Sequence, residues 1–271
     1  MTRALAALVW HSARRSRALL GATAALLVTF QALAALMAAS FEESDSFAQI
    51  AAMVPDFLRQ AFGSSFLALL SFTGIVLLGF FHFAIIAFLV GLAVAVATEP
   101  ASEVEHRFND LLLARPLPRW VPIARTTIVL LAVALLTCGA MCAGTWAGLA
   151  LYARAGVPWP EPRLILSLGG LMAALMLCCG GIALALGSAA RRRGVAGAGA
   201  GLLVFALFLL DVVARVWEPA RALGRLSPFH YFDPMSVAGG QPLDWSHLAV
   251  LLSVGAAGVA VAVVVYSRRD L

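Results

Sequence analysis

Long apolar runs separated by shorter polar segments make up most of the chain. Six of the runs approach or exceed the about 20 apolar residues that a helix needs to cross a membrane. They lie at residues 18–39, 66–97, 121–151, 164–190, 195–214 and 248–266. A transmembrane β-barrel would instead show segments of about ten residues that alternate apolar and polar positions. The pattern therefore predicts an all-α membrane protein, with residues 1–271 forming one transmembrane domain of six helices.

Three of the polar segments outside these runs predict further structure. Residues 1–17 carry apolar Leu5 and Leu8 on one helical face, which predicts an interfacial helix on the membrane surface. Residues 98–120 are charged, and we expect a short amphipathic helix there. Residues 215–247 are too polar to span, so we expect them at the outer interface, where aromatic rings are favoured.

The basic start and the first run also fit a secretory signal peptide. The run is longer than the 7 to 15 apolar residues of such a signal, and five further spans follow it. We therefore expect an uncleaved first helix.

The distribution of arginine predicts the orientation. The N-terminus, residues 98–125, the triplet 191–193 and the C-terminus together hold thirteen of the nineteen arginines, and the other segments hold six. An excess of basic residues marks the cytoplasmic side. We expect a multi-pass protein of the bacterial inner (plasma) membrane. Both of its termini are expected in the cytoplasm.

Composition narrows the possible functions. The chain is 62% hydrophobic and 12% charged, against roughly half and a quarter in soluble domains. It contains no lysine, so it cannot form the phosphate-binding loop of an ATPase, whose lysine reaches the β and γ phosphates. Any ATP-driven work must come from a partner. The glycines from Gly197 to Gly201 lack the third glycine and the preceding strand of a dinucleotide loop.

The sequence gives only weak signals for catalytic or metal-binding residues. Cys138 and Cys142 would share a helix face, and Cys178 and Cys179 lie in another apolar run, which favours core packing over a metal site. No HExxH, aspartate pair or G-x-S-x-G motif occurs, as an intramembrane enzyme would need. We expect no catalytic, cofactor-binding or metal-binding residue in this chain.

Three strongly polar residues within the runs are candidates for a translocation path: Gln31, His82 and Asp211. A secondary transporter driven by protons or sodium usually needs ionisable residues deep in the membrane, and it is the alternative to an ATP-driven transporter. His82 lies near the middle of the second run, where it either bonds a neighbouring helix or contacts substrate. Asp211 is expected to cap a helix or pair with an arginine of the outer loop.

Gly197 and Gly201 form a small-xxx-small pair of the kind that lets two helices pack tightly. The pair predicts a helix interface. The spacing leaves open whether the neighbouring helix belongs to a second subunit or to this chain.

The charged segment 98–120 places acidic and basic side chains around the apolar run Leu111–Leu113 and ends near prolines. Held at the membrane face by two spans, an amphipathic helix here is suited to a groove on a cytoplasmic protein, whose movement it would pass to the spans. A solvated charged linker is the alternative.

This segment resembles the E-x-x-x-x-[ED]-x-L-L-x-x-P-x-x-R pattern of type-2 ABC (ATP-binding-cassette) exporter permeases. LSPFHYF at 226–232 resembles the segment before that family's last helix, and YSRRDL at 266–271 resembles its C-terminus. Where many members carry Gly-Thr before the acidic position, this chain has Arg107 and Phe108. The likeness extends over most of the chain.

The resemblance implies a coupling helix between spans two and three and re-entrant helices before span six. It implies a permease subunit that exports a hydrophobic or amphipathic substrate, paired with a second permease subunit, either an identical copy or a sister chain. Two copies of a cytoplasmic ATPase subunit would bind ATP and Mg, and this chain would bind no cofactor. The residues that would couple to the ATPase are Glu103, Glu105, Asp110, Leu111, Leu112, Leu113, Arg115, Pro116 and Arg119.

Overall fold

The structure is a computed structural model that describes residues 2–43, 71–106 and 118–268. The regular elements within these ranges are all helical. In chain order they are α1 Thr2–Glu43, α4 Phe72–Val76, η1 Leu78–Phe80, α5 Phe83–Ala97, α6 Glu99–Glu105, α8 Val121–Tyr152, α9 Pro162–Ala189, α10 Arg193–Val216, η2 Glu218–Ala220, α11 Arg221–Gly224, η3 Pro228–Tyr231, α12 Pro234–Ala238 and α13 Trp245–Ser267. Here η denotes a 3₁₀ helix.

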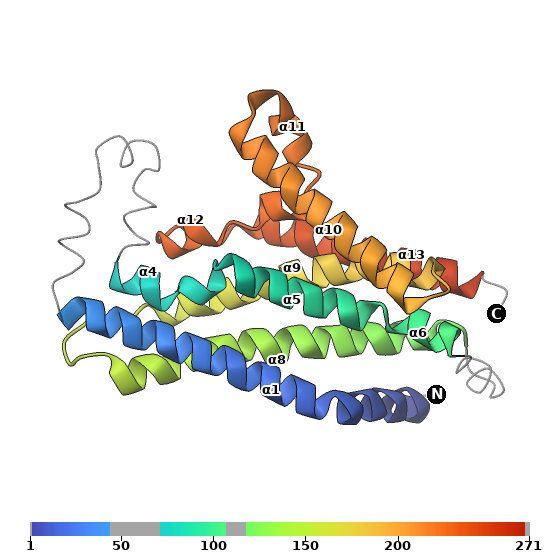
Figure 1. Cartoon of the computed structure of the whole chain (residues 1–271), viewed down its shortest axis with the longest axis horizontal. Helices are drawn as coiled ribbons and strands as arrows, with labels where there is room; N and C mark the ends of the chain where they lie inside the picture. The colour runs from blue at the N-terminus through green and yellow to red at the C-terminus, as the bar shows by residue number, and fades with distance from the viewer. Residues whose placement is uncertain (1, 44–70, 107–117, 269–271) are drawn as a thin grey trace.

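Six helices in the described ranges are long and apolar enough to cross a membrane. This confirms the predicted all-α membrane fold with six spans. The spans are α1, α5 with α6, α8, α9, α10 and α13 (Figure 1). The first residues of α1 and the last residues of α13 lie at the same end of the bundle as α6, and we call this the α6 end.

The central helix of the bundle is α9, which contacts α5, α8, α10 and α13. Within the most apolar window of each span, 72% of α9 is buried by the chain itself, compared with 22% of α10 and of α13. The large side chains of α9 that are fully covered include Ile165, Leu168 and Leu171. The outer helices therefore leave most of their surface for lipid or for partner proteins.

Two helix pairs in the bundle depend on glycine. A Cβ atom on Gly181 of α9 would lie 2.3 Å from the carbonyl oxygen of Gly255 in α13, and one on Gly144 of α8 would lie 2.7 Å from Val28 Cα in α1. Neither space accepts a side chain. Small residues let helix backbones approach closely in lipid, where no hydrophobic force drives helices together.

The second apolar run differs from its expected form. Residues 66–97 were expected to form one span, but the described part of this run contains α4, η1 and α5, and α5 begins only at Phe83. The break lies where η1 meets α1: a Cβ on Gly79 would lie 1.9 Å from Gln31 Oε1. Length and hydropathy cannot reveal such a break, because every residue from Phe72 to Phe81 except Thr73 is apolar or glycine.

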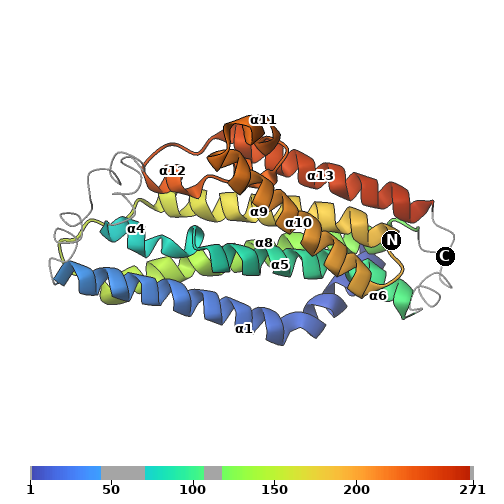
Figure 2. The same cartoon turned by 45° about the horizontal axis from the view of Figure 1, so that its top comes forward.

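The first helix is also longer than expected. Residues 1–17 and 18–39 were predicted as an interfacial helix and a span, and the structure joins them in the single helix α1. Figure 2 shows α1 changing direction toward its N-terminal end. The interfacial position of that end stays a prediction.

The segment between α10 and α13 consists of short helical turns: η2, α11, η3 and α12. It ends at Asp244, whose carboxylate caps α13 by accepting 2.8 and 2.7 Å hydrogen bonds from the Ser246 backbone N–H and hydroxyl. These hydrogen bonds hold the pKa of Asp244 below its usual range, so the carboxylate keeps its charge to a lower pH than a free aspartate would. Insertion of the short helices into the membrane stays a prediction.

Candidate functional site

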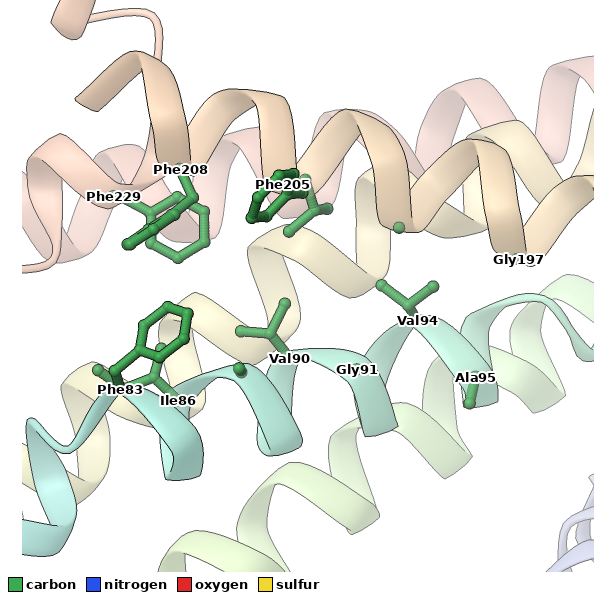
Figure 3. A pocket seen from close by; sticks show the side chains of 13 residues that line it. Phe83, Ile86, Val90, Gly91, Val94, Ala95, Gly197, Phe205, Phe208 and Phe229 are labelled. Carbon is green, nitrogen blue, oxygen red and sulfur yellow. The ribbon is translucent and has the colours of Figure 1, made fainter. Parts of the chain in front are cut away.

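A pocket of about 430 Å³ lies between α5 and α10. Figure 3 shows side chains from one face of each helix pointing into it, with Phe229 of η3 at one end. Its lining side chains are all apolar, and the lining residues are Phe83, Ile86, Ala87, Val90, Gly91, Val94, Ala95, Gly197, Gly201, Val204, Phe205, Phe208 and Phe229. Such a surface provides neither an acid, a base nor a metal ligand. It is suited to holding an apolar group.

The Phe229 end of the pocket is aromatic. The ring of Phe208 lies 5.2 Å from the ring of Phe83 and 5.4 Å from that of Phe229, with the second pair edge to face. The buried Ser227 fixes this arrangement: its hydroxyl donates to Leu207 O over 2.8 Å and accepts from the Phe229 N–H over 3.1 Å. Ser227 therefore attaches η3 to α10 and positions Phe229 over the pocket.

The other end of the pocket is formed by glycine and small side chains. Gly197 of α10 lies opposite Val94 and Ala95 of α5 (Figure 3), and Gly201 also lines the pocket. A Cβ added to either glycine would meet no described atom within 4 Å. This predicted small-xxx-small pair therefore lines the pocket and makes no tight contact with a described helix of the chain. Contact with a second subunit stays a prediction.

Gln31 is the first of the three candidates for a translocation path, and it joins α1 to α8. It is fully buried, and its Nε2 donates a 3.0 Å hydrogen bond to Thr145 Oγ1. The Thr145 hydroxyl in turn donates to Met141 O. Gln31 does not line the pocket.

His82 lies between η1 and α5, at the N-cap position of α5, and not within a continuous span. Its ring is exposed and packs edge to face on Phe30 of α1 at 5.9 Å. The next residue, Phe83, lines the pocket. His82 is therefore beside the pocket, and contact with substrate stays a prediction.

Asp211 lies on α10, one turn beyond Phe208. Its side chain is 6% exposed and accepts a 2.8 Å charged hydrogen bond from Arg215 Nε. His230 Nδ1 of η3 lies 3.8 Å from the other carboxylate oxygen. Arg215 opens the segment 215–247 that was expected as the outer loop, so the predicted arginine partner is found, although the structure includes it in the last turn of α10. Asp211 lies beside η3 and does not line the pocket.

At the α6 end, Glu103 is turned into the protein. Its carboxylate accepts from Arg125 of α8, and the side chains of the two residues are 9% and 6% exposed. The pair attaches α6 to α8. The buried carboxylate faces α8 and is not on the surface. A partner that docks at this end would therefore contact other side chains.

The remaining residues predicted to couple to an ATPase divide into two groups. Glu105 accepts from the backbone N–H of Arg193, the first residue of α10, over 2.9 Å, and Arg119 donates to Ser267 O at the end of α13 over 3.3 Å. The others lie outside the described residues: Asp110, Leu111, Leu112, Leu113, Arg115 and Pro116. Their coupling role stays a prediction.

The cysteines are buried free thiols within the bundle core. Cys138 Sγ lies 3.9 Å from Met176 Sδ of α9, and Cys142 Sγ lies 3.6 Å from Ile165 O. No cluster of three or more metal-ligating His, Cys, Asp or Glu residues occurs within residues 2–43, 71–106 and 118–268.

Several residues at the pocket and at the α6 end had no role in the sequence interpretation. From the sequence, phenylalanines such as Phe208 are indistinguishable from lipid-facing residues. Nothing in an apolar run shows which phenylalanine faces a pocket and which faces lipid. Arg125 and Arg193 entered the sequence analysis only as basic residues on the inner side. Their partners are 22 and 88 residues away, so local patterns cannot pair them.

Comparison with known proteins gives one result. The model of the ABC-2 family transporter protein matches residues 3–271. A comparison with curated protein sequences gave no significant match. The match extends over nearly the whole chain and agrees with the six apolar spans. The chain therefore belongs to the ABC-2 transporter family, whose members are the membrane-spanning permease components of ABC transporters.

Proposed function

We propose that this permease exports a hydrophobic or amphipathic substrate through the pocket between α5 and α10. ATP and Mg are bound and hydrolysed by a separate cytoplasmic subunit. The apolar lining of the pocket is the observation that carries the proposal.

The size and chemistry of the pocket support this substrate class. Its volume of about 430 Å³ falls within the roughly 300–1,000 Å³ of small-molecule sites. A charged group placed against its carbon walls would lose its hydration and gain no hydrogen bond in return. An apolar tail or ring would fit there, while a polar head would remain outside.

The arrangement of the α6 end supports the assignment of the cytoplasmic side. The helix ends of α1 and α13 and the arginine triplet 191–193 lie at this end, in agreement with an excess of basic residues on the inner side. The segment that follows α6, residues 107–117, is the proposed docking site for the ATPase. The proposed assembly contains two permease subunits and two ATPase subunits in the inner membrane.

The test is affinity purification of the tagged chain in mild detergent, followed by mass spectrometry and an ATPase assay of the complex. We expect stoichiometric recovery of a soluble ATP-binding-cassette protein and hydrolysis that vanadate inhibits. Recovery of the chain alone, without nucleotide hydrolysis, would contradict the proposal and favour an ion-coupled transporter.

A second test is the double variant Glu105→Ala/Asp110→Ala. We expect it to insert normally and to lose substrate-stimulated hydrolysis. Unchanged coupling in this variant would remove these two residues from the proposed docking site.

A further inference from the structure

The first residue of α10, Arg193, makes three contacts with α5 and α6. Its guanidinium lies 3.3 Å from Glu99 Oε2 and donates to Ala95 O over 3.4 Å. Its backbone N–H donates to Glu105 Oε2 over 2.9 Å. We call this group, formed by Arg193 with Ala95 O, Glu99 and Glu105, the Arg193 latch.

Glu105 acts as the missing cap of α10. The N-cap residue of that helix, Arg192, provides no side-chain hydrogen bond. The first N–H groups of a helix have no partner inside the helix, and its N-terminus carries a partial positive charge. The Glu105 carboxylate satisfies one of these donors and complements that charge, so α6 stabilises the start of a helix 88 residues later.

The latch borders the pocket directly. Ala95, whose carbonyl accepts from Arg193, also lines the pocket, as does Gly197, one turn after Arg193 on α10. Figure 3 shows Gly197 and Ala95 at the same end of the pocket. From this end, α10 diverges from α5 toward α11 (Figure 1). The latch therefore holds the two pocket helices together at the point where they are closest to α6.

The two sets of contacts made by α6 differ in how readily they break. Glu103 and Arg125 are buried, and separating a buried pair leaves a charge without compensation. In the latch, the side chains of Arg193 and Glu99 are 46% and 34% exposed, so water can replace their ion pair at little cost. Glu103 thus keeps α6 attached to α8, while the latch on α10 can open.

We infer that the Arg193 latch closes the pocket at its α6 end, and that release of Arg193 from Glu99 and Glu105 separates α10 from α5 and admits substrate from that side. Arg193, Glu99 and Glu105 are positioning residues: they act on the pocket through the helices that carry them. The inference rests on the proposed function only for the identity of the substrate.

The test measures access to the pocket in the full chain, reconstituted in lipid nanodiscs. The reporter is Gly197→Cys, a position where a Cβ meets no described atom, and the probe is a water-soluble maleimide. Arg193→Gln should raise the labelling rate at position 197 by about two- to fivefold, the effect of losing a partly exposed ion pair. Arg193→Lys should keep the labelling rate of the parent reporter, because lysine keeps the positive charge.

Two controls separate the latch from general effects. Arg191→Gln removes the same charge two residues away and should leave the rate unchanged. A thiol introduced by Gly199→Cys lies on the same part of α10 but does not line the pocket, so it should not respond unless the helix end frays. If Arg193→Gln is not monodisperse, Glu99→Gln provides the same test.

Equal labelling at position 197 in Arg193→Gln, Arg193→Lys and the parent reporter would overturn the inference, as would an equal rise in Arg191→Gln. Neither result depends on an ATPase. Failure to recover an ATPase partner would contradict the proposed function and leave the latch result intact.

Discussion

Single polar residues in this protein mostly hold helices together. Gln31 bonds Thr145 and Glu103 bonds Arg125 between helices, while Asp211 bonds Arg215 within α10. A polar group inside a bilayer is costly unless it finds a partner, so most such groups are used up in contacts within the chain. The pocket, by contrast, is lined by carbon. At this scale, polar residues mark contacts within the chain and do not mark the pocket.

The buried pair between α6 and α8 should be the most sensitive of these joints. Arg125→Met leaves the Glu103 carboxylate buried without its partner, and we expect a loss of about 3–5 kcal/mol in stability. Replacing both residues, with Glu103→Leu added, should recover most of the loss. The measurement is the midpoint of thermal unfolding in detergent. The exposed Arg163→Met is the control, and an equal loss there would contradict the prediction.

At the scale of whole elements, glycine divides the helix faces into two kinds. Gly181 of α9 lies against the backbone of Gly255 in α13 and allows no side chain. Gly197 and Gly201 of α10 face the open pocket, and a side chain could enter there. The same residue type thus serves close contact in one helix pair and empty space in another.

This division predicts opposite effects of the same substitution. Gly181→Ala forces α9 away from α13, and we expect it to destabilise the protein by about 1–3 kcal/mol. The added methyl of Gly197→Ala meets no atom of the described residues within 4 Å, so the change should be neutral or gain up to about 1 kcal/mol from helix propensity. Unfolding midpoints and light scattering measure both. If light scattering showed a lower oligomer mass for Gly197→Ala and not for Gly181→Ala, the result would instead support the predicted interface with a second subunit.

The helices are the part of the fold that the sequence predicts best, because length and hydropathy are local properties of a run. The break between η1 and α5 escapes this reasoning, because the residues around it are as apolar as those of a continuous span. The same holds for Gly197: spacing identifies a small-residue face but does not say whether a neighbour covers it. Contacts between distant segments, such as Glu105 with Arg193, have no local signature.

At the scale of the whole molecule, the two ends of the bundle differ. The α6 end gathers the ends of α1 and α13, the arginine triplet and the latch. At the opposite end lie α4 and the C-terminal part of α1, whereas α11 projects from the side of the bundle (Figure 1). The short helix η3 is attached to α10 through Ser227, so movement of α10 would carry η3 with it.

This asymmetry predicts which positions face outward. In spheroplasts, a membrane-impermeant maleimide should label Leu226→Cys, which lies at the exposed turn between α11 and η3. It should label Arg191→Cys only after the membrane is permeabilised. The four native thiols are buried, so the background should be low. The reverse labelling pattern would mean that the α6 end faces outward.

The close pairing of α9 with α13 also bears on how the protein is made. The ribosome completes α9 long before α13, which follows the other five spans in the sequence. Until α13 enters the membrane, the surface of α9 around Gly181 lacks the α13 backbone that packs against it. The central helix thus acquires this neighbour only after the other five spans have been made. Assembly of the core is therefore a post-insertion event, and a nascent chain halted before α13 would expose an incomplete core to membrane quality-control proteases.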